Sequence, residues 1–194
     1  MGEEVTQAVQ SFFNYGFLYD DINYTYIALV PKKNNPSGVV DFRPISLCNF
    51  VYKILSKVMA NRLKIILPYI ISCNQLAFIP SRSISDNILA AYETIHSMHS
   101  RMYGKVGYMA IKLDMNKAYD RAGWEFLEKV MKKMGFATKW LDLVMKCISS
   151  VSYYVLVNGS TVGLIKPTRG IRQGDPISPY LFLLCVEALS AKLS

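Results

Sequence analysis

The spacing of apolar residues along the chain predicts a mixture of helices and strands. Apolar residues that recur every three or four positions mark one face of a helix, whereas strict alternation marks a strand. Helical spacing covers residues 5–18, 50–67, 86–102, 138–149, a stretch after Asp120 and a stretch after Ser178, and strand patterns cover 23–30, 107–114 and two runs between 151 and 166. The sequence therefore predicts an α+β fold in which an antiparallel sheet, containing residues 107–114 and the 151–166 hairpin, packs on helices.

Short signals mark where several of these elements begin, turn or end. Asn158-Gly159 separates the two runs of the hairpin, and this dipeptide readily adopts the positive φ angles of a tight turn. Pro68 is expected to end the helix over residues 50–67, because proline disrupts the interior of a helix. Asp120 and Ser178 are expected to be the N-caps of the helices that follow them.

The strand over residues 107–114 ends on an aspartate. In the alternating pattern Lys112 and Asp114 belong to the face that points away from the apolar residues. A carboxylate at the end of a rigid strand can hold Mg²⁺, which prefers oxygen ligands and keeps room for water and phosphate. An aspartate at this place can equally be a turn or capping residue. The pattern alone therefore makes Asp114 only a candidate metal ligand.

The positive charge of the chain is unevenly distributed. The formal net charge is +8, with an isoelectric point near 9.3. No lysine or arginine precedes Lys32, whereas residues 31–64 contain seven of them against one acid, Asp41. Such a concentration favours a polyanionic partner through long-range attraction.

Two basic groups in this region are candidates for phosphate binding. Lys32 and Lys33 open a loop that leads to Arg43, and arginine offers a planar fork of donors while lysine offers a mobile point charge. Lys53, Lys57 and Lys64 fall within about 40° of one another on a helical wheel, opposite the apolar side. The loop could also be an exposed basic turn, and the lysine row could simply face water. The excess positive charge favours nucleic acid for the row.

Other features exclude several classes of protein. The four cysteines are widely separated and form no C-x-x-C pair, so they indicate reduced thiols rather than a zinc site or a disulfide framework. The start, MGEEVTQ, lacks the basic and apolar regions of a secretory signal. No apolar run approaches the roughly 20 residues of a membrane span. We therefore expect an intracellular protein, in the nucleus or cytoplasm, with no membrane partner.

Four ordered blocks of sequence resemble one family. YMAIKLDMNKAYDRAGW (Tyr108 to Trp124) and RGIRQGDPISPYLF (Arg169 to Phe182) resemble palm motifs of reverse transcriptases, most closely those of plant LINE-type non-LTR retrotransposons. VPKKNNPSGVVDFRPISLCNFVYKILSKVMANRLK (Val30 to Lys64) and NQLAFIPSRSISDNIL (Asn74 to Leu89) resemble the fingers segments of the same family. The resemblance covers about residues 24–194.

The resemblance implies a right-hand polymerase fold and a reaction. Residues 1–23 would be a helical lead-in, 24–104 the fingers and 105–194 part of the palm. The implied activity is RNA-directed DNA synthesis: a primer 3′-hydroxyl attacks the α-phosphate of a deoxynucleoside triphosphate and pyrophosphate leaves. Two Mg²⁺ ions, with Mn²⁺ as a substitute, would assist the transfer. The implied partners are an RNA template with a DNA primer, or an RNA–DNA hybrid, and deoxynucleoside triphosphates.

The resemblance also implies roles for single residues. Asp114 would be the first metal-binding aspartate, and Tyr119 would lie under the incoming sugar and leave no space for a 2′-hydroxyl. The remaining implied contacts are Gln173 and Gly174 to the nucleotide, Arg43 with Lys32 or Lys33 to the triphosphate, and Lys53, Lys57 and Lys64 to nucleic acid. Because two separate carboxylates are needed to hold two dications, Asp114 alone would not complete the metal site.

One expected motif does not occur in the sequence. The family follows its second palm block with a β-hairpin bearing Phe/Tyr-Ala-Asp-Asp, and no such tetrapeptide occurs among the 194 residues. The resemblance therefore implies a fingers and partial palm fragment, truncated before the catalytic hairpin and the thumb and inactive alone. The alternatives are a non-catalytic nucleic-acid-binding remnant and a fragment that does not fold stably.

Overall fold

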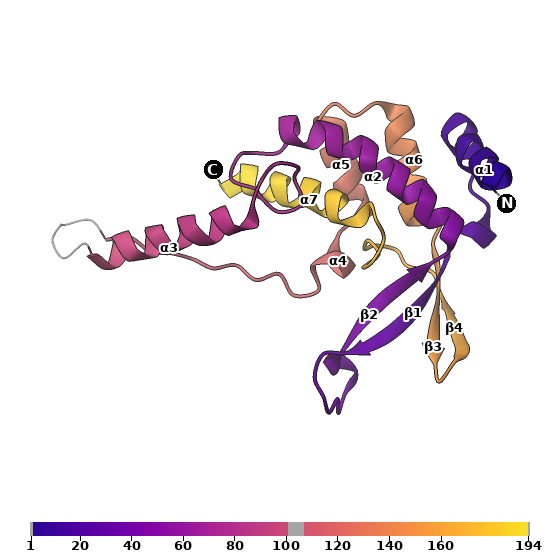
Figure 1. Ribbon diagram of the computed structural model, residues 1–194, viewed down its shortest axis with the longest axis horizontal. Helices are drawn as coiled ribbons and strands as arrows, with labels where there is room; N and C mark the ends of the chain where they lie inside the picture. Colours follow the sequence, from indigo (N-terminus) through magenta and orange to yellow (C-terminus); the bar gives the residue numbers. More distant parts are fainter. Residues whose placement is uncertain (1, 101–106, 194) are drawn as a thin grey trace.

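The computed structural model describes residues 2–100 and 107–193, and it shows a helical body with a small sheet at one end (Figure 1). The helices are α1 (Gly2–Tyr15), α2 (Phe50–Ile70), α3 (Ile84–Ser100), α4 (Ala118–Arg121), α5 (Trp124–Lys133), α6 (Thr138–Ser149) and α7 (Ser178–Leu193). The strands are β1 (Tyr24–Pro31), β2 (Phe42–Cys48), β3 (Ser152–Val157) and β4 (Ser160–Ile165). The predicted α+β class is confirmed.

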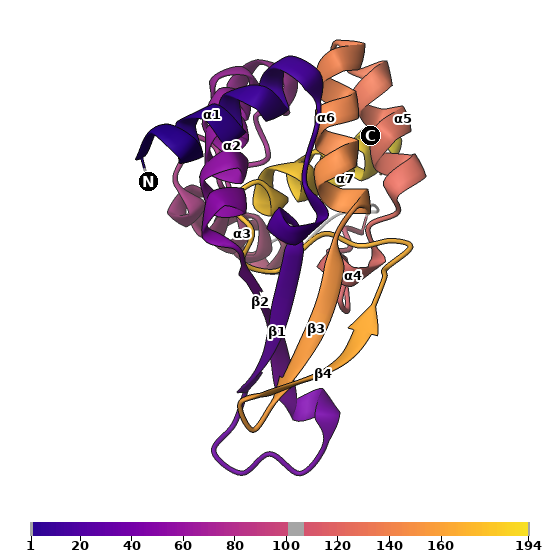
Figure 2. The same cartoon turned by 90° about the vertical axis from the view of Figure 1, so that its right-hand side faces the viewer.

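The sheet joins segments from distant parts of the sequence. Its order is β2-β1-β3-β4, and Figure 2 shows it extending away from the helices. β1 pairs with β2 and β3 with β4 in antiparallel fashion, but β1 and β3 are parallel, with Tyr26 opposite Tyr154. The hairpin is confirmed: Asn158 and Gly159 have φ angles of 51° and 79°. The expected antiparallel sheet of residues 107–114 and this hairpin is wrong in its second neighbour: β3 lies parallel to β1, because the long connection through the helices lets β3 return in the same direction.

Residues 107–114 form no strand, contrary to the prediction. They run beside α3 back to α4, as Figure 1 shows, and pair with no strand in the described chain. The apolar side chains of Met109, Ile111 and Leu113 are 67–80% exposed. Alternation predicts which side a residue faces only when a neighbouring strand holds the backbone. The sequence also predicts a turn from Gly104 to Gly107 before this stretch, but residues 104–106 lie outside the described residues.

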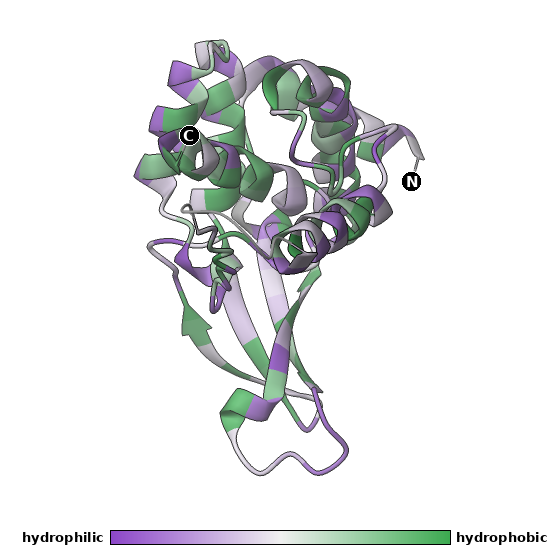
Figure 3. Ribbon diagram, turned by 90° about the vertical axis from the view of Figure 1, so that its left-hand side faces the viewer, coloured by the Kyte–Doolittle hydropathy of each residue, from purple (hydrophilic) through white to green (hydrophobic). Residues whose placement is uncertain are grey.

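The hydrophobic core lies among the helices. Its fully buried side chains include Leu55, Met59, Leu63 and Leu67 of α2, Leu127 and Met131 of α5, Val144 of α6, and Leu181 and Leu184 of α7. Figure 3 shows hydrophobic residues gathered in this body, whereas the loop between β1 and β2 is mostly hydrophilic. α3 contributes no buried residue and projects from the body (Figure 1). The core therefore holds α2, α5, α6 and α7 as one unit, from which the sheet extends.

Some helices begin and end where the sequence predicted, and others do not. α6 has the predicted bounds, and α1 ends at Tyr15, just before Gly16 with its φ of 68°. α2 continues past Pro68 to Ile70, because a proline in the last turn removes only one hydrogen bond. Asp120 lies inside α4, and α5 begins after Gly123 without a side-chain cap. Ser178 is the first residue of α7, and its Oγ has no hydrogen-bond partner within the described chain.

Candidate functional site

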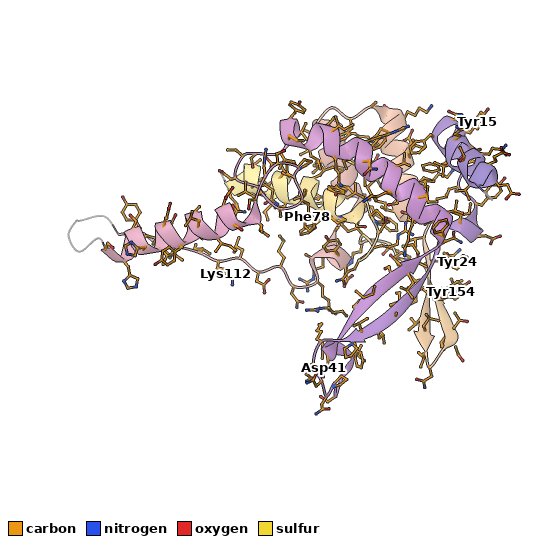
Figure 4. All side chains as sticks on the ribbon, viewed as in Figure 1. Tyr15, Tyr24, Asp41, Phe78, Lys112 and Tyr154 are labelled. Atoms are coloured by element: carbon orange, nitrogen blue, oxygen red, sulfur yellow. The ribbon has the colours of Figure 1, made fainter. Side chains whose placement is uncertain are left out.

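The strands β1 and β2 with the loop between them form a flap whose tip is organised by Asp41. One carboxylate oxygen of Asp41 accepts hydrogen bonds from the backbone N–H groups of Ser37 (2.8 Å) and Gly38 (3.1 Å) and lies 3.0 Å from Lys33 Nζ. The Ser37 N–H and the Lys33 ammonium lower the pKa of Asp41, because both stabilise the charged form. Figure 4 labels Asp41 at the far end of the flap. The ammonium of Lys33 is therefore engaged within the flap itself.

A cleft of about 530 Å³ lies between the flap and α4. Its lining comprises Leu29, Lys32, Val39, Val40, Phe42, Arg43 and Pro44 from the flap, Asn116, Lys117, Ala118, Tyr119 and Asp120 from the region of α4, and Gln173. Four of the residues singled out from the sequence thus line one cleft: Lys32, Arg43, Tyr119 and Gln173. Lys33, Gly174 and Asp114 are not among the lining residues. Lys117 and Asp120 were not predicted to belong to this surface.

Tyr119 is held in place from two sides. Its ring stacks on that of Phe182 from α7, with centroids 5.1 Å apart and an interplanar angle of 18°. Its carbonyl oxygen accepts a hydrogen bond from Ile171 N (3.0 Å). Desolvation raises the pKa of the Tyr119 hydroxyl, so the ring presents a neutral phenol to the cleft. The position of this ring is therefore fixed by packing.

The loop that carries Gln173 is anchored by a buried ion pair. Arg172 Nε lies 3.2 Å from Asp175 Oδ2, and the two side chains are 2% and 1% exposed. Arg172 donates to Asn23 Oδ1 (2.7 Å), to Thr25 Oγ1 (3.2 Å) and to the carbonyl of Cys147 (2.9 Å). Burial disfavours its charged form, but the neighbouring Tyr52 and Asp175 outweigh burial and raise the pKa of Arg172. The guanidinium therefore stays charged inside the protein.

The carboxylate of Asp175 is fully occupied by α2 and its own loop. The Tyr52 hydroxyl donates to Oδ2 (2.8 Å), and the Ser56 hydroxyl and Ile177 N donate to Oδ1. Sequence patterns did not identify this network. The sequence feature that could have indicated this network is the i, i+4 spacing of Tyr52 and Ser56, which puts two polar groups on the core face of a helix. Asp175 is thus a structural acceptor with no free lone pair for a metal ion.

Asp114 lies beside the cleft rather than in it. It lines a neighbouring apolar groove of about 730 Å³ with Phe126 of α5 and Phe182 and Leu189 of α7, and the groove and the cleft share Asn116 and Ala118. The roles implied by the resemblance would bring Asp114 and Gln173 to the same nucleotide, and therefore to one cleft. The structure places them in adjacent hollows, because residues 107–114 are not fixed in a sheet.

The described side chains do not fit a two-metal site by themselves. Across residues 2–100 and 107–193 there is no group of three or more His, Cys, Asp or Glu side chains that could hold a metal ion. Asp175 is committed to Arg172, Tyr52 and Ser56. Two dications need several carboxylates, so Asp114 alone could not hold them.

The three lysines of α2 are not equivalent. Lys53 and Lys57 are exposed on the face opposite the core. Lys64 is half-buried, with Nζ 5.5 Å from the centroid of the Tyr180 ring. This cation–π geometry ties Lys64 to α7. The exposed basic surface of α2 is therefore shorter than the sequence predicted.

None of the described helices is long and apolar enough to cross a membrane.

Comparison with known proteins shows which family the sequence of this chain matches. The family model described as "Reverse transcriptase (RNA-dependent DNA polymerase)" matches residues 30–194. The Transposon TX1 uncharacterized 149 kDa protein of Xenopus laevis is 28% identical over 187 residues, which are 96% of this chain and 14% of that protein. The Pol polyprotein of the Drosophila melanogaster type-2 retrotransposable element R2DM is 27% identical over 174 residues, 90% of this chain and 16% of that protein.

A shorter match is much closer in sequence. An uncharacterized mitochondrial protein of Arabidopsis thaliana is 60% identical over 40 residues, which are 20% of this chain and 33% of that protein. The chain spans only 14% and 16% of the TX1 and R2DM proteins, so it corresponds to one part of them. The family match covers most of the chain, including most of the flap and all of the loop that line the cleft. This chain therefore belongs to the reverse transcriptase family, as a domain of the non-LTR retrotransposon type.

Proposed function

We propose that this domain serves RNA-directed DNA synthesis in a LINE-type retrotransposon of plants, with the cleft as the site of the incoming deoxynucleoside triphosphate. The observation that carries the proposal is the cleft itself, which brings Lys32 and Arg43 of the flap together with Tyr119 and Gln173. Two cations suit a triphosphate, an aromatic ring suits the sugar, and a side-chain amide suits a polar group of the nucleotide. The short, close match to an Arabidopsis thaliana protein supports the plant origin.

The residues singled out from the sequence have these roles in the proposal. Lys32 and Arg43 bind the triphosphate, and Lys33 supports the flap through Asp41. Tyr119 packs under the sugar, where its ring, fixed by Phe182, leaves no space for a 2′-hydroxyl. Gln173 contacts the nucleotide, and Gly174 lets the backbone of this loop approach β2. The cleft would therefore select deoxynucleotides.

Metal binding needs more of the polypeptide. Reverse transcriptases use divalent metal ions, and we propose Mg²⁺ here, with Mn²⁺ as a substitute and Asp114 as the first ligand. The apolar groove beside Asp114 and the exposed Met109, Ile111 and Leu113 offer a surface on which a hairpin bearing the remaining aspartates could pack. The chain alone would then be inactive as a polymerase.

The nucleic-acid partners lie along the basic part of the chain. We propose that an RNA template with its DNA primer, or their hybrid, runs along Lys53 and Lys57 of α2 toward the cleft. Residues 24–104 would be the fingers, 105–194 part of the palm and 1–23 a lead-in. We also propose that the protein acts inside the cell, in the nucleus or cytoplasm.

Replacing Lys32 by alanine should weaken binding of dTTP with Mg²⁺ at least tenfold. A hydrogen bond to a charged group contributes about 1.5–3 kcal/mol, and 1.4 kcal/mol is a factor of ten in affinity. Equilibrium dialysis with labelled dTTP measures the change. Lys33→Ala is the matched control, because Lys33 adjoins Lys32 but pairs with Asp41 outside the cleft. Equal losses for both variants would mean that the cleft does not bind the triphosphate.

The joint replacement of Lys53 and Lys57 by alanine should reduce the salt dependence of RNA binding. Each phosphate contact contributes about 0.7 to the slope of log affinity against log salt for a single strand, so the slope should fall by roughly 1.4. Lys64→Ala should change it less, because Lys64 is packed against Tyr180. Fluorescence anisotropy with a labelled RNA at several salt concentrations measures the slopes. An unchanged slope would make these lysines a solvated surface only.

A second candidate function has one observation in its favour. Asp114 lies outside the cleft, which suits a protein that binds nucleic acid without catalysis. Such a protein would retain the salt-dependent RNA binding but show no saturable binding of dTTP. The two experiments above therefore separate the two functions.

A further inference from the structure

We propose that the ion pair of Arg172 and Asp175 is a positioning clamp that fixes Gln173 in the cleft. The clamp consists of these two side chains, and Gln173 and Gly174 are the two residues between them. The proposal rests on the cleft being the nucleotide site. Arg172 and Asp175 act through Gln173, so they are positioning residues rather than catalytic ones.

The burial pattern of four consecutive residues supports the clamp. Arg172 and Asp175 are buried, whereas Gln173 and Gly174 between them are exposed. Arg172 Nε and Asp175 Oδ2 are 3.2 Å apart and join the two ends of this short loop. A loop of two residues whose ends are bonded to each other inside the protein has few conformations. The ion pair therefore determines how Gln173 is presented to the cleft.

Each side of the clamp is attached to a different part of the fold. Arg172 donates to Asn23 and Thr25, at the base of the flap, and to the carbonyl of Cys147 in α6. Asp175 accepts from Tyr52 and Ser56 of α2. The clamp thus relates the loop to the flap and to the helical body at once. Since the flap and the loop both line the cleft, the clamp fixes the position of Gln173 relative to the flap.

The loop also makes a direct contact that reports on the clamp. Ser46 N in β2 donates to the carbonyl of Gln173 at 2.9 Å. Gly174 has a φ of 105°, and a Cβ there would lie 3.3 Å from Ser46 O, so the close approach requires glycine. If the clamp loosens, the loop moves away from β2 and the Ser46 amide loses its acceptor. Hydrogen exchange at Ser46 therefore measures the clamp without any nucleotide.

Tyr52→Phe tests the clamp with a minimal change. It removes the hydroxyl that donates to Asp175 but keeps the ring, whose centroid lies 3.8 Å from Arg172 Cζ. We expect exchange at the Ser46 amide to become at least tenfold faster and dTTP affinity to fall about five- to tenfold. Amides of the α6 core should exchange as in the wild type, because the opening is local. Tyr154→Phe, a tyrosine of β3 outside the clamp, is the matched control and should change neither quantity.

The outcomes separate the clamp from the nucleotide site. If Tyr52→Phe and Tyr154→Phe show the same Ser46 exchange, the clamp is refuted, whether or not dTTP binds. If Ser46 exchange rises while dTTP affinity stays at the wild-type value, the ion pair is structural and does not position Gln173. Absence of dTTP binding in the wild type refutes the nucleotide site, and Ser46 exchange still decides whether the loop is clamped. Ser56→Ala, which removes the other hydroxyl donor, should reproduce both changes if Tyr52→Phe does not fold.

Discussion

Replacing Asp175 by alanine should lower the free energy of unfolding by about 3–5 kcal/mol. The change leaves the guanidinium of Arg172 buried without its carboxylate, and it leaves the hydroxyls of Tyr52 and Ser56 without an acceptor. Removing one partner of a buried ion pair is costly because the remaining charge can reach neither water nor an opposite charge. Urea unfolding followed by circular dichroism measures the loss.

The matched control is Asp41→Ala. Asp41 also accepts several hydrogen bonds and pairs with a cation, but it lies on the solvent-facing flap, where water screens the pair, so its replacement should destabilise the fold much less. Joint replacement of Arg172 by methionine and Asp175 by leucine should recover part of the loss, because no charge is left unpaired. A loss below about 1 kcal/mol for Asp175→Ala would contradict the account of the ion pair.

Local sequence signals predicted the elements that depend on local geometry. The turn at Asn158-Gly159 needs only two residues that accept positive φ, and the α6 helix needs only its own apolar spacing. The strand β1 followed from a β-rich run that stops before a basic loop. For these elements the neighbouring residues carry the information, so sequence and structure agree.

The cleft depends on contacts that a local pattern does not contain. β1 and β3 pair across more than 120 positions, with Tyr26 opposite Tyr154, and the direction of that pairing follows from how the intervening helices pack. The residues around Arg172 in the sequence give no sign that its side chain is buried. Its partners Asn23 and Cys147 lie far from it in the sequence, so only the folded structure shows this burial. The resemblance to a family predicted Lys32, Arg43, Tyr119 and Gln173, and the structure brings these four together.

The wrong prediction of a strand over residues 107–114, which end on Asp114, has a physical cause. Alternation assigned its side chain to a face, but a strand has defined faces only when hydrogen bonds to a neighbour hold it. Residues 107–114 have no such neighbour among the described residues, so Asp114 is exposed beside an apolar groove. Its place relative to the cleft would then depend on what packs in that groove.

Asp114→Asn should lower primer extension by about 1,000-fold in a longer polypeptide that adds the catalytic hairpin and the thumb. Asparagine keeps the shape of aspartate but removes the negative charge that a doubly charged ion requires, and loss of about 4 kcal/mol of transition-state stabilisation corresponds to this factor. Asp142→Asn, a change of the same kind at an exposed aspartate of α6, is the control and should extend primers as the wild type does. Equal activity of the two variants would remove Asp114 from the mechanism.

Primer extension on an RNA template is the most direct test of the polymerase proposal. The 194-residue chain should give no product with Mg²⁺ or Mn²⁺, the longer polypeptide should extend the primer with deoxynucleotides, and Asp114→Asn in the longer polypeptide should lower extension by about 1,000-fold. Product from the 194-residue chain alone, or undiminished product from the longer polypeptide with Asp114→Asn, would contradict the account.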